Sequence, residues 1–397
     1  MIASKKTDFI EHIVHGIAWL PSFEQLRSLS DDDWDGVVVT AIALGLAPLL
    51  HWHLDQVKIT VPSLALAKLA VTRQAHTKRN EGIALQLAEI LAACHRHQVD
   101  TLVLKGALLA PTHYDEAGLR PMNDIDLLFR PSDLAQAGSV LESLGYIGKH
   151  KTVDQGPGVT KHVSTYRRAG NQGATPNPYL SPGADRTVEP HGSLEESWFG
   201  LKVDMTPGVW ERAVPIALHD QPAYRLSTGD LLLHLIVHAV FHVIMGASVF
   251  VQLYDIAQVL AKRSNEIDWP QFLTLAGRAG AQPLAYAGLY WAKTVYKAPV
   301  PDAYLLELES ACPSSLSTYI KSLDAAGLFK RTQHPPLVSL GQRLRRGLAD
   351  RRETARWAVS PGAKWRVWRT ALAFYKTDTA AILSKGLKGL SRQSANT

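Results

Sequence analysis

Residues 120–129 (RPMNDIDLLF) restrict the possible folds of this chain more than any other segment. Side chains alternate between the two faces of a β-strand. Ile125 and Leu127 therefore point to one face, whereas Asp124 and Asp126 point to the other. The pattern predicts a sheet that packs on a hydrophobic core with one face and presents carboxylates on its opposite face.

Two carboxylates on one strand face repel each other, so Asp124 and Asp126 need a cation or free access to water. Hard divalent cations such as Mg²⁺ take oxygen ligands in this way, and a pair of them can clamp a triphosphate for in-line displacement at phosphorus. The alternative is a solvated strand end with two surface acids. On repulsion alone, replacing either aspartate by asparagine should leave the fold intact or slightly more stable without metal.

The segment before the acidic strand has the pattern of a strand, a turn and a helix. Residues 101–104 (TLVL) predict a buried strand, Lys105-Gly106 a turn, and residues 107–114 a short helix. A glycine there lets phosphate approach the backbone, and a helix N-terminus favours anions. Lys105 can add a positive charge, or it can be a surface lysine beside an ordinary turn. Arg120 can bind phosphate oxygens or pair with a nearby carboxylate.

Helical patterns flank this central part and indicate an α+β protein. Apolar residues recur at intervals of three and four over residues 1–98 and 227–329, which predicts an N-terminal helical region and a second helical domain. Residues 99–226 between them predict an α/β core with a long loop at 148–186, where Gly, Pro, Asn and Gln concentrate. A basic tail, 330–397, follows.

Residues 231–254 carry no formal charge and are long enough to span a bilayer. His234, His238 and His242 lie among them, and Gly246 interrupts the run. Such polar groups are costly in lipid unless they have partners, so the segment predicts a buried helix, a turn and a second buried helix. We therefore expect no integral membrane span.

The three histidines are spaced by four residues, so they fall on one helix face. The sequence has no HExxH motif or cysteine pair beside them, which favours an ordinary packed helix over a metal site. His238, His242 and the nearby Asp255 can nevertheless line a cleft and orient a phosphate or an acceptor.

Composition indicates a globular protein, because 46% of the 397 residues are hydrophobic and 20% are charged. At roughly 150 residues per domain, this length predicts two or three packed units. Cys94 and Cys312 form no CxxC motif and no disulfide framework, which favours a reducing compartment. The first residues include acidic side chains before any apolar run, so we expect no export signal and a cytoplasmic location.

The net charge of +6 is unevenly distributed. Residues 330–397 contain 15 Lys or Arg and 3 Asp or Glu, a net charge of +12, which leaves −6 for the rest. Basic residues interleaved with Trp357, Trp365 and Trp368 suit an anionic partner, such as nucleic acid, an acidic protein or an anionic membrane surface. They equally suit an amphipathic helix that packs its tryptophans on the body of the protein.

Three motifs of this chain resemble the uncharacterised nucleotidyltransferase family of the polymerase-β-like superfamily. They are residues 104–107 (LKGA), 118–128 (GLRPMNDIDLL) and 188–191 (VEPH). The resemblance extends over roughly residues 25 to 310. It implies a small mixed β-sheet core with helical regions on either side in sequence. It also implies two Mg²⁺ ions held by two aspartates of one strand and a carboxylate of a neighbouring strand.

In this resemblance Asp124 and Asp126 match the two aspartates, and Glu189 is the natural third carboxylate. Asp185 and Glu195 are its competitors.

Two local features qualify the match. Pro190 cannot donate to a sheet ladder, so the strand around it should be very short or lie at a sheet edge. The Gly-Ser that is usual in the superfamily is Gly106-Ala107 here, which removes a hydroxyl commonly assigned to phosphate and affects the expected affinity for the donor.

The resemblance implies an enzyme that moves a nucleoside monophosphate from an NTP, such as ATP, to an unidentified acceptor and releases pyrophosphate. Lys105, Gly106, Arg120, His238 and His242 would contact the nucleotide. Two alternatives stay open: a phosphoryl transferase that uses the same two-metal site, and a non-catalytic nucleotide-binding or adaptor protein.

Overall fold

The structure is a computed structural model that describes residues 2–18, 22–57, 59–150, 164–168, 177, 179, 184–334 and 339–371. The chain divides into two compact units. The first comprises Met1–Lys151, Lys161–Glu196 and Val203–His334, and the second comprises Thr152–Thr160, Ser197–Lys202 and Pro335–Thr397. The four-part division expected from the sequence remains a prediction.

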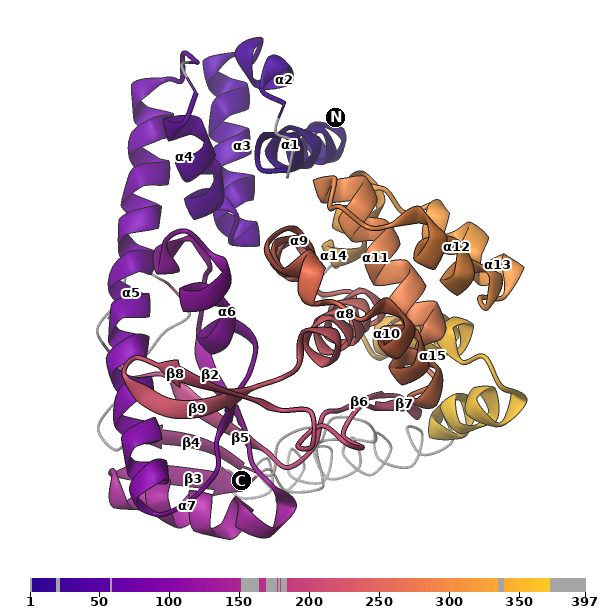
Figure 1. Cartoon of the computed structure of the whole chain (residues 1–397). Helices are drawn as coiled ribbons and strands as arrows, with labels where there is room; N and C mark the ends of the chain where they lie inside the picture. Colours follow the sequence, from indigo (N-terminus) through magenta and orange to yellow (C-terminus); the bar gives the residue numbers. More distant parts are fainter. Residues whose placement is uncertain are drawn as a thin grey trace, which may run out of the picture. The chain divides into compact units, whose positions relative to one another are not determined.

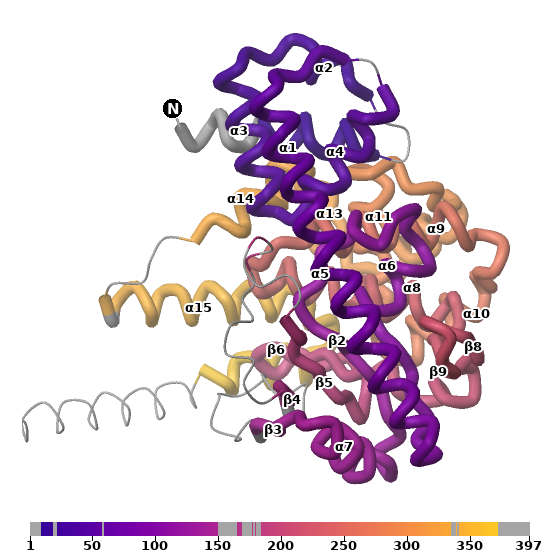
Figure 2. The backbone as a smooth tube through the Cα atoms, turned by 90° about the vertical axis from the view of Figure 1, so that its left-hand side faces the viewer, coloured from indigo at the N-terminus to yellow at the C-terminus, as the bar shows by residue number. Residues whose placement is uncertain are grey.

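The first unit begins with five helices. They are α1 (Ile2–Gly16), α2 (Glu24–Arg27), α3 (Asp31–Leu44), α4 (Ala47–Asp55) and α5 (Ser63–Arg96). Ser30 caps α3, because its side chain accepts a hydrogen bond from the Asp33 backbone N–H, and acidic residues fill the first turn. α5 runs without a break for 34 residues, from α3 and α4 to the sheet (Figures 1 and 2).

Buried amide side chains of α5 hold two segments that lead into strands. The Asn80 side chain donates to the carbonyl oxygens of Ala117 and Arg120, just before the acidic strand. Further along α5, Gln86 donates to the carbonyl oxygen of Arg186 and accepts from the N–H of the same residue, both at 2.8 Å. One helix therefore fixes the backbone at the start of both strands that carry the candidate carboxylates.

Seven strands form one mixed sheet in the order β3-β4-β5-β2-β1-β9-β8. Their bounds are β1 (Leu102–Val103), β2 (Asp124–Leu128), β3 (Tyr146–His150), β4 (Ser164–Arg168), β5 (Thr187–His191), β8 (Val214–Leu218) and β9 (Gln221–Arg225). β2 pairs in parallel with β5 and β1 in parallel with β9, whereas the other neighbours are antiparallel. A second, two-stranded sheet pairs β6 (Glu195–Trp198) with β7 (Leu201–Asp204). The predicted α+β class is confirmed.

The expectation that the strand around Pro190 is very short or lies at a sheet edge is wrong. β5 has five residues and lies between β4 and β2. Its carbonyl at His191 accepts from the Phe129 N–H, so the backbone of His191 faces β2 and the adjacent Pro190 faces β4. β4 meets β5 at Tyr166 and Val188, before the proline. The N–H that proline lacks therefore interrupts no described ladder bond.

Two helices of the core contact the sheet. α6 (Lys105–His113) contacts β2, and α7 (Leu134–Ser143) contacts β3 and β5. Short 3₁₀ turns at Ala117–Leu119 and Pro131–Asp133 precede β2 and α7. The turn expected at Lys105-Gly106 is instead the first turn of α6. Most of the loop expected at 148–186 lies outside the described residues.

Helices form the rest of the first unit. They are α8 (Thr228–Met245), α9 (Phe250–Arg263), α10 (Trp269–Arg278), α11 (Gln282–Tyr296), α12 (Asp302–Ser310), α13 (Ser314–Lys321) and α14 (Ala325–Thr332), with a 3₁₀ turn at Ser264–Glu266. Gly246 ends α8 with a backbone conformation in the left-handed region, which produces the expected turn between two buried helices. Among the described helices, α8 alone is long and apolar enough to cross a membrane, and 83% of its apolar window is buried inside the structure.

The second unit contains α15 (Leu340–Trp357) and a further helical stretch over 361–371. Not all of its basic residues face solvent. Arg351 is buried, donates to the carbonyl oxygens of Gly347 and Thr370, and stacks over the ring of Phe199. The tryptophans also divide, because Trp357 is buried whereas Trp365 and Trp368 are 64% and 42% exposed.

A buried ion pair holds the segment before β2 against α9. The Arg120 guanidinium donates from two nitrogens to both carboxylate oxygens of Asp255, each at 2.8 Å, and Tyr114 donates to the same carboxylate. Asp255 is fully buried. Burial alone would lower the pKa of Arg120, but Asp255 raises it above its ordinary value. Of the two roles open to Arg120, the structure shows the pairing with a carboxylate.

We expect Asp255→Asn to lower the free energy of unfolding by about 3–5 kcal/mol, because it leaves a buried guanidinium without its counter-charge. Chemical denaturation measures the change. Asp115→Asn is the matched control, since Asp115 pairs with Lys262 at the surface, where loss of a pair costs about 1 kcal/mol or less. Equal effects of the two changes would show that the buried pair does not stabilise the fold.

Candidate active site

The acidic strand β2 has the two faces that its sequence predicts. Ile125 and Leu127 are fully buried in the core, and the aspartates occupy the opposite face. Their surroundings differ, however. Asp126 is only 3% exposed, whereas Asp124, at the start of the strand, reaches solvent.

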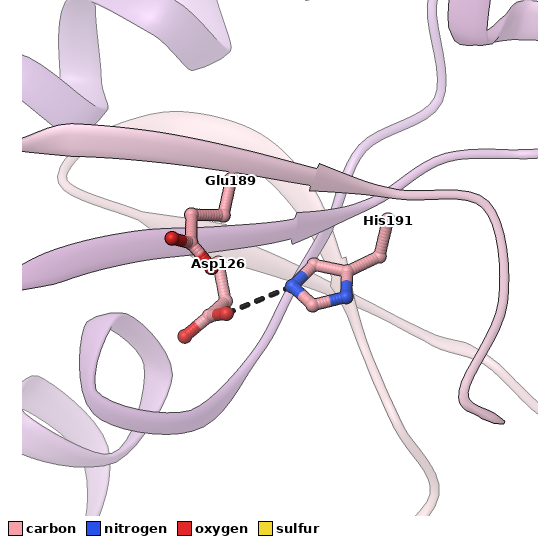
Figure 3. A group of neighbouring side chains, drawn as sticks. All are labelled: Asp126, Glu189 and His191. Carbon is pink, nitrogen blue, oxygen red and sulfur yellow. Dashed lines mark hydrogen bonds and ion pairs between the residues drawn. The ribbon is translucent and has the colours of Figure 1, made fainter. Parts of the chain in front are cut away.

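The parallel pairing of β2 with β5 brings a third carboxylate to this face. Glu189 is the register partner of Asp126, so the two side chains lie side by side (Figure 3). One ligand atom from each of Asp126, Glu189 and His191 lies within 4.8 Å of the others. The competitors are placed elsewhere, because Asp185 pairs with Arg168 and Glu195 belongs to β6.

Two side chains, of Lys105 and His191, converge on one oxygen of Asp126. Lys105 Nζ and His191 Nε2 each lie 2.8 Å from Asp126 Oδ1. Lys105 reaches this position from a backbone φ of +45°, a region that costs energy for any residue except glycine. A strained residue at the start of α6 therefore delivers the positive charge to the buried carboxylate.

These contacts separate the two aspartates electrostatically. Burial alone would raise the pKa of Asp126, but Lys105 and the hydrogen bond from His191 hold it well below its usual range. Although Asp124 reaches solvent, desolvation by the protein atoms around its carboxyl group, followed by repulsion from Asp126, raises the pKa of Asp124 to about 7. Burial alone would lower the pKa of Lys105, but the carboxylates of Asp126 and Asp124 raise it. Asp126 is thus an anion in a salt bridge, and Asp124 holds its proton more tightly than a free aspartate.

Gly106 is required by close packing. A Cβ atom there would lie 2.2 Å from Nη1 of Arg120 and 2.9 Å from Cγ of Met122. Both neighbours belong to the segment that leads into β2, so the missing side chain lets that segment approach α6. The expected contact between Gly106 and phosphate remains a prediction.

The carboxylates line a cavity of about 630 Å³ in the first unit. α3, the start of α6, the segment before β2, both acidic strands, α8 and α9 contribute to its wall. Every predicted site residue reaches this wall: Lys105, Gly106, Arg120, Asp124, Asp126, Glu189, His238 and His242. The structure therefore gathers residues that lie up to 137 positions apart in the sequence.

The three histidines of α8 have different surroundings. His238 and His242 line the cavity, with ring centroids 4.6 Å apart. His238 Nδ1 lies 3.1 Å from Glu196 Oε1, and His242 Nδ1 lies 3.0 Å from the Ser248 carbonyl oxygen. His234 is buried, with its ring 6.3 Å from that of His238. On this face of α8, His234 is therefore packed in the interior, whereas His238 and His242 line the cavity.

The donor set fits a divalent metal ion. Asp126 and Glu189 supply carboxylate oxygens side by side, Asp124 lies on the same strand face, and hard cations prefer such ligands. His191 adds a nitrogen, which also suits transition metals. Lys105 already neutralises part of the Asp126 charge, so an ion must share that carboxylate with the lysine.

The fold and the site together define a mixed-sheet protein with an acidic candidate metal site in a cavity. The chain belongs to the family described as uncharacterised nucleotidyltransferase, whose family profile matches residues 30–297. This span includes every residue named in the site. Comparisons with curated proteins and with solved structures found no significant match. Family membership supports a transferase with a general role in nucleotidyl transfer.

Sequence reasoning did not select two residues of this site. His191 lies two residues after Glu189, so strand alternation puts both on one face, and that spacing was an available indication. His76 lines the cavity from α5 and is 7% exposed. No local motif marks His76, because its place depends on how α5 packs.

We expect the two asparagine replacements to have opposite effects on stability without metal, which corrects the expectation that both are neutral or stabilising. Asp124→Asn should stabilise the fold. The raised pKa of Asp124 makes the wild type lose stability as the pH rises from about 4 to about 7, so the gain should be complete at pH 8 and vanish below pH 4. Solvent at Asp124 moderates its size.

Asp126→Asn should destabilise the fold, because it leaves Lys105 and His191 without their anion. The lowered pKa of Asp126 means that this loss is complete at neutral pH and shrinks below pH 4, where the unfolded aspartate is protonated. Denaturation curves at pH 8 and pH 4 test Asp124→Asn, and curves at pH 8 and below pH 4 test Asp126→Asn. Stabilisation by both changes would mean that repulsion between the aspartates outweighs the salt bridge.

Proposed function

We propose that the chain is a Mg²⁺-dependent nucleotidyltransferase that moves a nucleoside monophosphate from an NTP to an acceptor and releases pyrophosphate. The observation that carries this proposal is the register of β2 with β5, which puts Asp126 beside Glu189 in the cavity wall, with Asp124 on the same strand face. Family membership supports the reaction class.

Asp124, Asp126 and Glu189 would hold the Mg²⁺ ions, two in number, with His191 contacting Asp126. When bound, such ions neutralise the phosphate charge and stabilise the attacking and leaving oxygens of an in-line displacement. Lys105 holds Asp126 in its anionic form through their salt bridge and keeps a positive charge at the start of α6, where a phosphate would lie.

The other predicted contacts are assigned on position. Arg120 lines the cavity while Asp255 engages its guanidinium, so Arg120 would contribute positive potential rather than a bidentate grip on phosphate. His238 and His242 lie in the wall formed by α8, where they would orient nucleotide or acceptor. Gly106 would let the nucleotide approach α6.

Two other functions use the same cavity. Transfer of the terminal phosphoryl group would release nucleoside diphosphate, and a binding protein would retain NTP without turnover. The replacement of Gly-Ser by Gly106-Ala107 is the feature that favours the binding protein. Incubation with Mg²⁺ and each α-labelled NTP in a lysate of the source organism tests all three. Pyrophosphate and a labelled acceptor support the proposal.

We expect Asp124→Asn, Asp126→Asn and Glu189→Gln each to lower turnover by at least about 10²-fold, because each removes a carboxylate from the proposed metal site. Pyrophosphate release measures turnover, and melting curves confirm folding.

Asp185→Asn and Glu195→Gln are the matched controls, since both are acidic residues near β5 in sequence that lie outside the cavity wall. Both should keep wild-type turnover. An inactive Asp185→Asn beside an active Glu189→Gln would refute the assignment of Glu189.

For the second unit we propose an anionic partner, such as an acidic macromolecule or membrane surface. Arg343, Arg345, Arg352 and Arg356 are exposed on α15, whereas Arg351 is buried. Replacing the four exposed arginines by glutamine in the full chain should weaken binding to anionic lipid vesicles, and moderate salt should mimic the change.

The variant with all four arginines replaced should keep the melting temperature of the wild type. Arg351→Gln is the contrasting change and should lower it, because Arg351 donates to buried carbonyl groups. Unchanged vesicle binding by the variant with four replaced arginines would rule out a role of α15 in binding an anionic membrane surface.

A further inference from the structure

A fourth carboxylate acts on the cavity wall indirectly, through a histidine. Glu196 of β6 is 3% exposed, and its Oε1 lies 3.1 Å from Nδ1 of His238. His238 lines the cavity from α8, whereas Asp124, Asp126 and Glu189 line it from β2 and β5. A buried carboxylate is retained when a charged or polar partner compensates it, and His238 is such a partner.

The contact determines which ring nitrogen can accept a proton. Glu196 is an acceptor, so Nδ1 of His238 carries the hydrogen and donates it. The nitrogen that Glu196 does not engage is Nε2, which is the basic nitrogen of this tautomer. An adjacent carboxylate also stabilises the imidazolium that forms when Nε2 takes a proton. This is the arrangement of a histidine base oriented by a third group.

His242 provides an internal comparison. It lies one turn away and lines the same cavity, but its Nδ1 faces the Ser248 carbonyl oxygen rather than a carboxylate. A carbonyl fixes the tautomer without supplying a full negative charge. Of the two cavity histidines on α8, His238 therefore has the surroundings of a proton acceptor.

We propose that His238 is the general base that deprotonates a hydroxyl nucleophile of the acceptor, and that Glu196 positions it. The inference rests on the proposed nucleotidyl transfer. In this step the acceptor oxygen forms a bond to the α-phosphorus as the bond from that phosphorus to the bridging oxygen of pyrophosphate breaks. The hydroxyl proton passes to Nε2 of His238, and pyrophosphate leaves with the bonding electrons.

A base is useful only for a nucleophile that keeps its proton at neutral pH. A phosphate or carboxylate acceptor is already an anion at neutral pH and requires no proton acceptor, whereas a hydroxyl group keeps its proton. Among the described residues, the groups that contact His238 include Glu196 from β6 and the rings of His234 and His242 on α8. Lys105 and the carboxylates of β2 and β5 line the same cavity.

Two variants separate the role of His238 as the base from the role of Glu196 in positioning it. His238→Asn keeps a side-chain N–H for Glu196 but has no basic nitrogen. Glu196→Gln keeps a hydrogen-bond acceptor but removes the charge. Glu195→Gln is the matched control, since alternation puts the adjacent residue of β6 on the other face. Pyrophosphate release from Mg-NTP is measured with water and glycerol as hydroxyl nucleophiles and with inorganic phosphate as an anionic nucleophile.

We expect His238→Asn to lower kcat with water and glycerol by about 10²-fold or more, and to lower the rate with phosphate much less. Glu196→Gln should show the same selectivity with a smaller loss, and Glu195→Gln should match the wild type. An equal loss with all nucleophiles, or a change confined to the KM, would overturn the role of His238. Failure of nucleotidyl transfer itself is distinct, because the wild type would then release no pyrophosphate with any nucleophile: a phosphoryl transferase would yield nucleoside diphosphate and phosphate from water, and a binding protein would yield no product.

Discussion

The parallel pairing of β2 with β5 decides where the charged groups of the cavity lie. It sets Asp126 against Glu189 and brings His191 to the same carboxylate. The pairing exists because both strands bury apolar side chains on their other face, Ile125 and Val188 among them. Hydrophobic burial thus provides the energy that holds like charges together at the cavity.

The charges are stabilised from outside the sheet. Lys105 approaches Asp126 from α6 in a strained backbone conformation, and the Arg120–Asp255 pair secures the segment before β2 from α9. Strain of this kind persists only where the surrounding structure determines the conformation, and it concentrates at functional sites. The two ion pairs therefore tie two helices, α6 and α9, to β2 and the segment before it.

The sequence predicts the local part of this arrangement. Alternation along β2 is enough to place Asp124 and Asp126 on one face, whereas Glu189 follows only from the family resemblance, with Asp185 and Glu195 as competitors. Long-range choices are not encoded locally. Whether Arg120 meets phosphate or carboxylate depends on Asp255, on another helix, and Pro190 is tolerated because of which neighbour it faces. β8 and β9 escape prediction because His219 and Asp220, rather than glycine or asparagine, form their left-handed turn.

α5 contacts the backbone before β2 and the backbone before β5. Asn80 binds the first segment and Gln86 binds the second, so the distance between these two side chains along α5 must match the distance between the two segments. One residue added within that interval would turn every later side chain by about 100° around the helix axis and remove Gln86 from its partner. The contacts of Asn80 and Gln86 therefore fix the number of residues that α5 can have between them.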